Sequence, residues 1–283
     1  MTIIKKAQDL QDYIATFRQE NRKIGFVPTM GALHQGHISL IHESVTNNAL
    51  TVASIFINPT QFNDPKDFEK YPITIENDIV LLEKAGCDIL FLPSVKEIYP
   101  NGTDQQETYD LGYLETILEG EFRPGHFQGV CMVIERLLNI IKPANLYLGQ
   151  KDYQQCMVVK RLAELTGFDK TVNINICPTL RENDGLAMSS RNMRLSIADR
   201  KIASTIYEAL QQLKDSIKPG NLAQIKEQAK TLLSANGFKP DYVEIAAADN
   251  LKILENWDGH QKIVALIAAF LNEVRLIDNM ELN

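Results

Sequence analysis

The most informative motif of this chain is Lys23-Ile-Gly-Phe-Val-Pro-Thr-Met-Gly-Ala-Leu-His-Gln-Gly-His37. Apolar residues 24–27 predict a short buried strand, which we expect Pro28 to end. The glycines predict a turn, and the apolar spacing of residues 38–45 predicts a helix that begins near His37. Where a strand passes through such a turn into a helix, backbone N–H groups and the helix dipole favour an anion.

Two histidines, His34 and His37, lie in this turn. A P-loop is excluded because His37-Ile38 stands where Lys-Ser/Thr is required, and the Rossmann glycine motif is absent. The His-x-Gly-His sequence on a strand–turn–helix resembles the signature of the nucleotidylyltransferase superfamily, which includes class I aminoacyl-tRNA synthetases. That resemblance implies that the histidines contact ATP phosphates. A turn with two exposed histidines is the alternative.

The composition is that of a globular protein of one large or two ordinary domains, with 283 residues, 45% hydrophobic and 23% charged. A net charge of -7 without a long basic run argues against a nucleic-acid partner. The N-terminus carries charges where a signal peptide would be apolar, and the longest apolar run, residues 263–271, is too short to span a membrane. We therefore expect a cytoplasmic protein with no membrane partner.

Cysteine usage agrees with that location. The four cysteines are far apart and lie in or beside apolar segments, which predicts reduced core residues rather than metal ligands or disulfides. They are Cys87, Cys131, Cys156 and Cys177.

Strand-like and helix-like segments alternate up to about residue 180. Strands are predicted at 50–57, 88–92, 145–148 and 172–177, and helices at 75–85, 130–141 and 153–166, with an N-terminal amphipathic helix around Leu10, Ile14 and Phe17. This alternation predicts an α/β fold with a Rossmann-like, doubly wound parallel sheet. Beyond it, helices at 197–214 and 222–236 and strands at 242–247, 262–271 and 274–277 predict a small α+β domain. We place the domains at 1–178 and 179–283.

Polar clusters follow several of the strands, where α/β sheets bind ligands. Asn58-Pro-Thr-Gln61 offers amides to a small molecule, or is a plain Asn-Pro turn. Gly149-Gln-Lys-Asp152 offers a lysine to phosphate, or Asp152 caps a helix. Met188-Ser-Ser-Arg-Asn192 suits a triphosphate, or is the N-cap of the following helix. Residues 119–127 form either a substrate-side lid or a surface crossover.

Eight ordered motifs together resemble the pantoate–β-alanine ligase family. They are residues 27–37, 56–62, 97–102, 118–120, 123–127, 149–155, 184–192 and 275–279. The resemblance extends from the first strand to the C-terminus. It implies the ATP-dependent condensation of pantoate with β-alanine through a pantoyl adenylate, with release of AMP and pyrophosphate.

The resemblance also implies roles for individual residues. The ATP site would be lined by Met30, Gly31, Ala32, Leu33, His34, Gln35, Gly36, His37, Gly149, Gln150, Lys151, Asp152, Leu180, Met188, Ser189, Ser190 and Arg191. The catalytic donors to the phosphates would be His34, His37, Lys151, Ser189, Ser190 and Arg191, with His37 as the proton donor. Gln61 and Gln155 would hold pantoate, together with Asn58, and Gln61 would also lie near β-alanine.

The family further implies Mg²⁺ and a homodimer built on the N-terminal domain. Asp78 is the candidate magnesium ligand, although we expect the ion to be held mainly through the ATP phosphates. Asn77 and Gln150 depart from the acidic residues that are common in the family at these positions. A nucleotidylyltransferase that leaves AMP on its product, and an ATP-sensing module, remain as alternative functions.

Overall fold

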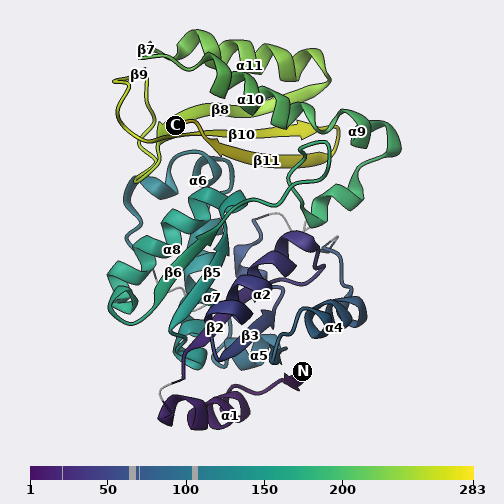
Figure 1. Cartoon of the computed structure of the whole chain (residues 1–283), viewed down its shortest axis with the longest axis vertical. Coiled ribbons are helices and arrows are strands. Elements are labelled where there is room, and N and C mark those ends of the chain that lie inside the picture. Colours follow the sequence, from purple (N-terminus) through teal and green to yellow (C-terminus); the bar gives the residue numbers. More distant parts are fainter. Residues whose placement is uncertain (21, 64–67, 70, 104–107) are drawn as a thin grey trace. The chain divides into compact units, whose positions relative to one another are not determined.

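The computed structural model describes residues 1–20, 22–63, 68–69, 71–103 and 108–283. It divides the chain into two compact units (Figure 1). The first unit comprises residues 1–149 and 155–178, and the second comprises residues 150–154 and 179–283. Residues 150–154, which we expected in the N-terminal domain, are thus grouped with the C-terminal residues.

A six-stranded parallel sheet forms the centre of the first unit. Its order is β1 (Thr2–Ile4), β4 (Ile89–Phe91), β3 (Leu50–Ile55), β2 (Ile24–Thr29), β5 (Asn145–Gly149) and β6 (Asn173–Cys177). The chain proceeds outward from β2 through β3 to β4, and outward on the other side from β5 to β6. The order therefore reverses between β2 and β5, and the predicted Rossmann-like, doubly wound sheet is confirmed.

Helices cover this sheet (Figure 1). The helices along this part of the chain are α1 (Ala7–Gln19), α2 (Gln35–Asn47), α4 (Ile75–Lys84), α5 (Val95–Ile98), α6 (Glu119–Phe122), α7 (His126–Ile141) and α8 (Tyr153–Thr166), and the 3₁₀ turns are η1 (Pro59–Gln61), η2 (Gly112–Glu115) and η4 (Phe168–Lys170). Apolar side chains of α2 and α4, such as Ile41 and Leu82, form one core with Val27 and Ala53 of the sheet. This core anchors the start of α2 above the sheet.

Three local differences from the sequence prediction occur near the N-terminus. The short strand β1 was not predicted, because three residues are too few to show a period. Pro28 lies inside β2 instead of ending it; β5 pairs only with Gly25 and Phe26, so the missing N–H of Pro28 interrupts no pairing on that side. Helix α2 begins at Gln35, two residues before the predicted start, because His34 caps it.

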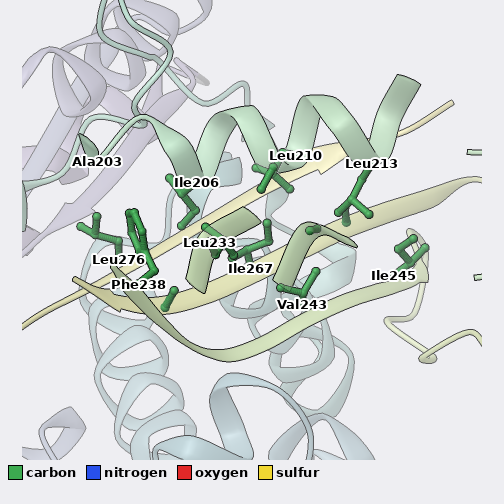
Figure 2. Packing of buried hydrophobic residues seen from close by; sticks show 14 of the residues in the cluster. Ala203, Ile206, Leu210, Leu213, Leu233, Phe238, Val243, Ile245, Ile267 and Leu276 are labelled. Atoms are coloured by element: carbon green, nitrogen blue, oxygen red, sulfur yellow. The ribbon is translucent and has the colours of Figure 1, made fainter. Parts of the chain in front are cut away.

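The second unit contains a three-stranded antiparallel sheet with helices packed on it. The sheet has the order β11 (Val274–Glu281), β10 (Ile263–Leu271) and β8 (Phe238–Ala247), and β7 (Gly220–Asn221) pairs with β9 (Asn256–Trp257). The remaining elements are η3 (Gln150–Asp152), η5 (Ser190–Arg194), α9 (Ile197–Ile202), α10 (Thr205–Ser216) and α11 (Ala223–Ala235). Figure 2 shows Ile206, Leu210 and Leu213 of α10 pointing toward the strands. The predicted smaller α+β fold is confirmed.

The predicted single helix over 197–214 is wrong, because the chain forms two helices with a break at Ala203 and Ser204. At the break, Ile206 N donates to Ala203 O and Tyr207 N donates to Ser204 O, so the turn tightens to i→i+3 hydrogen bonds. Neither glycine nor proline marks this position, so the periodicity alone could not reveal it.

Ile267 tests the core of the second unit, because it is fully buried at the centre of β10. Replacing it with alanine leaves a cavity, and we expect the free energy of unfolding to fall by about 2–5 kcal/mol in urea denaturation. Ile197 of α9 is 84% exposed, and Ile197→Ala should change that free energy by less than about 0.5 kcal/mol. Equal effects of the two substitutions would contradict this assignment of the core.

Candidate active site

The turn after β2 has an unusual backbone. Gly31 and Ala32 both adopt positive φ, of 82° and 49°. Glycine is required at the first position by space as well as by conformation, because a Cβ there would lie 3.1 Å from Asp78 Oδ2 and 3.1 Å from Ile55 Cγ2. Thr29 Oγ1 accepts a hydrogen bond from Gly31 N at 3.2 Å and donates to Ser54 O at 2.7 Å. The turn is therefore attached to both β2 and β3.

His34 and His37 cap the first turn of α2 reciprocally. His34 Nδ1 accepts from Gly36 N at 3.2 Å, and His37 Nδ1 accepts from His34 N at 3.3 Å, with the ring centroids 4.0 Å apart. An Nδ1 atom that accepts carries no hydrogen, so each neutral imidazole has its hydrogen on Nε2. The two rings thus bring N–H donors to the positive end of the α2 dipole, the arrangement that an anion requires.

Asp78 of α4 binds the backbone of the same turn. Its side chain is buried, with an exposed fraction of 1%. Oδ2 accepts from Ala32 N at 2.9 Å, and Oδ1 accepts from Leu33 N at 2.8 Å and from Thr74 Oγ1 at 3.1 Å. Among the described residues there is no group of three or more His, Cys, Asp or Glu side chains that could hold a metal ion. The buried carboxylate of Asp78, whose oxygens already accept from three donors, therefore does not fit the role of a magnesium ligand.

The amides predicted for the substrate site are joined to each other. Buried Asn58 donates to Gln61 Oε1 at 3.2 Å and to Gly129 O at 3.0 Å, and its own Oδ1 accepts from Tyr99 Oη at 2.8 Å. Gln61 Nε2 in turn contacts Met30 Sδ at 2.9 Å. Asn58 and Gln61 thus lie beside the turn after β2 and are more than a plain Asn-Pro turn.

Gln155 belongs to the first turn of α8 and is partly exposed. No hydrogen bond joins it to Asn58 or Gln61 within the parts of the chain that the structure describes. The structure therefore brings two of the three predicted amides into direct contact.

His126 supports Gln61 from the start of α7. Its Nδ1 donates to Gln61 O at 2.7 Å, and Arg123 donates to its Nε2 at 3.1 Å. Because a guanidinium can only donate, this imidazole is the Nδ1–H tautomer, opposite to His34 and His37. Glu119, Gly120 and His126 are buried, and residues 119–122 form α6. This packing favours the crossover over the lid for this segment.

Lys151 lies in the second unit, in the short turn η3. Its ammonium is 3.7 Å from Asp152 Oδ1, and its side chain is 16% exposed. Asn279 Nδ2 donates to Gln150 O at 2.9 Å and to Lys151 O at 2.8 Å. The end of β11 therefore fixes the backbone that carries this lysine.

A buried ion pair supports Asn279 from the neighbouring residue. Arg181 donates to both oxygens of Asp278, at 2.6 and 3.0 Å, and to Gly185 O and Asn279 O. Burial raises the pKa of the Asp278 carboxyl, and the hydrogen bonds from Arg181 oppose that rise. Removing Arg181 would leave the fully buried Asp278 side chain without its compensating charge.

The Met188–Arg191 segment begins next to a β-bridge that Arg181, one partner of this ion pair, forms. Arg181 and Ala187 form a β-bridge, and Met188 N donates to Leu180 O at 3.0 Å. Ser189 Oγ accepts from Arg191 N at 3.3 Å and so caps η5. The segment thus provides the N-cap of the short helical turn that follows it, whereas the longer helix α9 is capped by Ser196.

The cysteines are buried and free, as expected of core residues. Burial raises the pKa of Cys87 and of Cys131 to about 12, so their reactive thiolates are disfavoured. In the part of the chain that the structure describes, no helix is both long and apolar enough to cross a membrane.

Comparison with known proteins identifies the family. A model described as pantoate-beta-alanine ligase matches residues 2–281. The chain belongs to this family. The pantothenate synthetases of Cytophaga hutchinsonii and Porphyromonas gingivalis are 46% and 41% identical to it, each over 283 residues and 99% of both chains. The chain is accordingly a ligase that forms pantothenate from pantoate and β-alanine.

Solved structures of the family match the chain along its whole length. The pantothenate synthetase of Thermus thermophilus is 38% identical, with a TM-score of 0.91 and coverage of 100% of this chain and 99% of that one. The pantoate–β-alanine ligase of Francisella tularensis, complexed with β-γ ATP and β-alanine, is 40% identical, with a TM-score of 0.83 and coverage of 99% and 97%.

Within each unit, several residues hold candidate site residues in place in ways that the sequence did not predict. Arg123, His126, Asp278 and Asn279 lay in motifs that carried the family resemblance, but no role was assigned to Asp278 or Asn279. Their partners lie far along the chain: 97 residues separate Arg181 from Asp278, and 128 separate Lys151 from Asn279. Only the fold reveals such pairs.

Asn279 can be tested by substitution with alanine, which leaves two backbone carbonyls of η3 without their donor. We expect the free energy of unfolding to fall by about 1–3 kcal/mol, and pantothenate formation to slow because the Lys151 segment is no longer held. Urea denaturation and a product assay measure the two effects. Asn256→Ala, at an exposed position of β9, is the control. If Asn279→Ala behaved like this control, the two hydrogen bonds would not hold the segment.

Proposed function

We propose that this ligase activates pantoate with ATP in a first step and transfers the acyl group to β-alanine in a second. A pantoate carboxylate oxygen attacks the α-phosphorus, the bond to the β-phosphate oxygen breaks, and pyrophosphate leaves. The neutral amine of β-alanine then attacks the acyl carbon, the bond to AMP breaks, and the nitrogen loses a proton. Adenylation replaces a poor leaving group by AMP, so one difficult amide formation becomes two easier displacements.

The observation that carries this proposal is the pair of hydrogen bonds that His34 and His37 make at the start of α2. His34 and His37 use Nδ1 to cap the helix, which places the hydrogen of each neutral ring on Nε2, at the N-terminus of α2. In the first step, negative charge grows on the phosphate oxygens and the departing pyrophosphate, and donors fixed in advance stabilise that charge. We propose this role for both histidines, with His37 as the proton donor, and ATP contacts for the rest of residues 30–37.

Residues of the second unit have matching chemistry. We propose that Lys151, Ser189, Ser190 and Arg191 donate to ATP phosphates, because ammonium, hydroxyl and guanidinium groups are the usual phosphate donors. Gly149, Gln150, Asp152, Leu180 and Met188 are proposed to complete the contacts with the nucleotide. Support comes from the hydrogen bonds that hold the segments carrying Lys151 and Arg191.

We propose that Gln61, Gln155 and Asn58 bind pantoate, and that Gln61 also lies near β-alanine. Carboxamides can both donate to a carboxylate and accept from hydroxyl groups, which are the polar groups of this hydroxy acid. The fixed position of Gln61 supports the assignment, since Met30, Asn58 and His126 all contact it.

Three further properties are proposed from family resemblance. Mg²⁺ enters with the ATP phosphates and keeps several of its waters, as this ion commonly does. Two copies of the chain form a homodimer through the N-terminal residues 1–178. The enzyme works in the cytoplasm.

Product analysis tests the reaction. With ATP, pantoate and β-alanine, we expect AMP, pyrophosphate and pantothenate to appear in equal amounts, which chromatography with mass detection measures. Omitting β-alanine should leave at most one enzyme-bound pantoyl adenylate per site. Formation of ADP, or a stable adenylylated end product, would exclude this mechanism; the second result would favour nucleotidyl transfer.

His37→Ala should slow adenylate formation about 100-fold or more, because one preorganised donor to the phosphates is lost. Pantoate-dependent exchange of labelled pyrophosphate into ATP isolates this step from amide formation. His42→Ala is the matched control, since His42 is exposed on the same helix α2 and lies outside the site. Wild-type exchange by His37→Ala would rule out the proposed role.

A further inference from the structure

We propose that Asp78 is a positioning residue for the turn after β2, and that it acts through backbone N–H groups rather than as a magnesium ligand. The inference rests on the proposed function, because that function assigns the turn to ATP. It concerns a residue that touches neither substrate nor nucleotide and that holds the residues which do. Asp78 lies in α4, whereas the turn lies between β2 and α2.

The geometry of the contact is that of a two-point clamp. One carboxylate oxygen accepts from Ala32 N at 2.9 Å and the other accepts from Leu33 N at 2.8 Å. Thr74 Oγ1 donates to Oδ1 at 3.1 Å and so fixes the rotation of the carboxylate. Hydrogen bonds to an ionised acceptor are about twice as strong as neutral ones, and here two of them hold consecutive peptides.

The turn needs such a clamp because its backbone is strained. Ala32 has a φ of 49°, a left-handed conformation that costs a residue with a Cβ about 1–2 kcal/mol. It is followed by Leu33 and then by His34, the N-cap of α2. If Ala32 relaxed to negative φ, the chain would enter α2 in another direction, and His34 and His37 would move with it.

A magnesium ligand would need a different environment. Mg²⁺ requires oxygen ligands in near-ideal octahedral geometry and usually keeps several waters. Both oxygens of Asp78 already accept from N–H or O–H donors, and the side chain is 1% exposed. Glu76 and Asn77, its neighbours on α4, are exposed and make no hydrogen bond to this carboxylate in the described part of the chain.

Asp78→Asn tests the clamp with little change in shape. The amide presents an NH₂ group to one of the two backbone N–H donors, so one hydrogen bond is replaced by a repulsive contact. We expect kcat/KM for ATP to fall about 10- to 100-fold, the usual effect of losing a hydrogen bond to a charged group. Glu76→Gln removes an exposed carboxylate from the same helix and should leave kcat/KM unchanged.

Magnesium titration at saturating ATP separates positioning from metal binding. For a positioning residue, the Mg²⁺ concentration that gives half-maximal rate is the same in Asp78→Asn and wild type, and extra Mg²⁺ restores nothing. A half-maximal concentration that rises at least several-fold, with recovery of the rate at high Mg²⁺, would overturn the proposal in favour of a metal ligand.

A second substitution asks whether the backbone conformation is what Asp78 maintains. Glycine adopts positive φ without strain, so Ala32→Gly should recover several-fold of the activity lost in Asp78→Asn. The comparison is a double-mutant cycle against Ala32→Gly alone, which isolates the coupling between the two positions. Strictly additive effects would contradict the proposal.

Hydrogen exchange of the free enzyme gives a readout that needs neither ATP nor Mg²⁺. The Ala32 and Leu33 amides should exchange at least tenfold faster in Asp78→Asn, while amides in the centre of β3 are unchanged. If that variant does not fold, Thr74→Val removes only the hydroxyl donor, and a smaller acceleration at the same two amides is expected. Unchanged exchange at both amides in the folded variant would refute the clamp. Wild-type enzyme that forms no AMP would refute the proposed function but leave this result intact.

Discussion

The left-handed backbone at Gly31 and Ala32 is the constraint on which the first unit of this ligase depends. It allows the chain to leave a buried parallel strand and begin a helix within six residues, from Thr29 to Gln35. Its strain is offset by contacts from two other elements, through Thr29 with Ser54 and through Asp78. A turn held from several sides keeps the N-terminus of α2 in place before any ligand arrives, which is what electrostatic preorganisation requires.

In the second unit, an ion pair between Arg181 and Asp278 holds the loops that carry candidate site residues. Arg181 and Asp278 are costly to bury, and burial itself raises the pKa of the carboxyl. The pair fixes the positions of neighbouring segments, because the guanidinium binds the Asp278 carboxylate, Asn279 O and Gly185 O at once. The Asn279 side chain in turn donates to the carbonyls of η3. Apolar residues of the same volume could stabilise the unit as well, but they could not fix these loops in one position.

The sequence predicted the sheet and the main clusters of this ligase because those signals are local. A β-branched run such as Leu50–Ile55, or two histidines after one strand, can be recognised without knowing the fold. The contacts that hold the clusters are not local: Asp78 lies 46 residues from Ala32 and resembles any acidic residue in the first turns of a helix. The break after α9 was missed for another reason, since neither glycine nor proline stands there and the apolar periodicity continues across it.

The distribution of charge makes chemical sense of the proposed roles. Cations and N–H donors are assigned to the phosphates, where negative charge grows during adenylation, and carboxamides to pantoate. A guanidinium paired with pantoate would bind most strongly the carboxylate lone pairs that have to attack phosphorus, and so would stabilise the ground state more than the transition state. Gln61 can orient the acid through weaker bonds that the attack does not have to break. The fixed tautomers extend this logic, because His126 donates its one N–H, on Nδ1, to Gln61, whereas His34 and His37 accept with Nδ1 and carry the hydrogen of the neutral ring on Nε2.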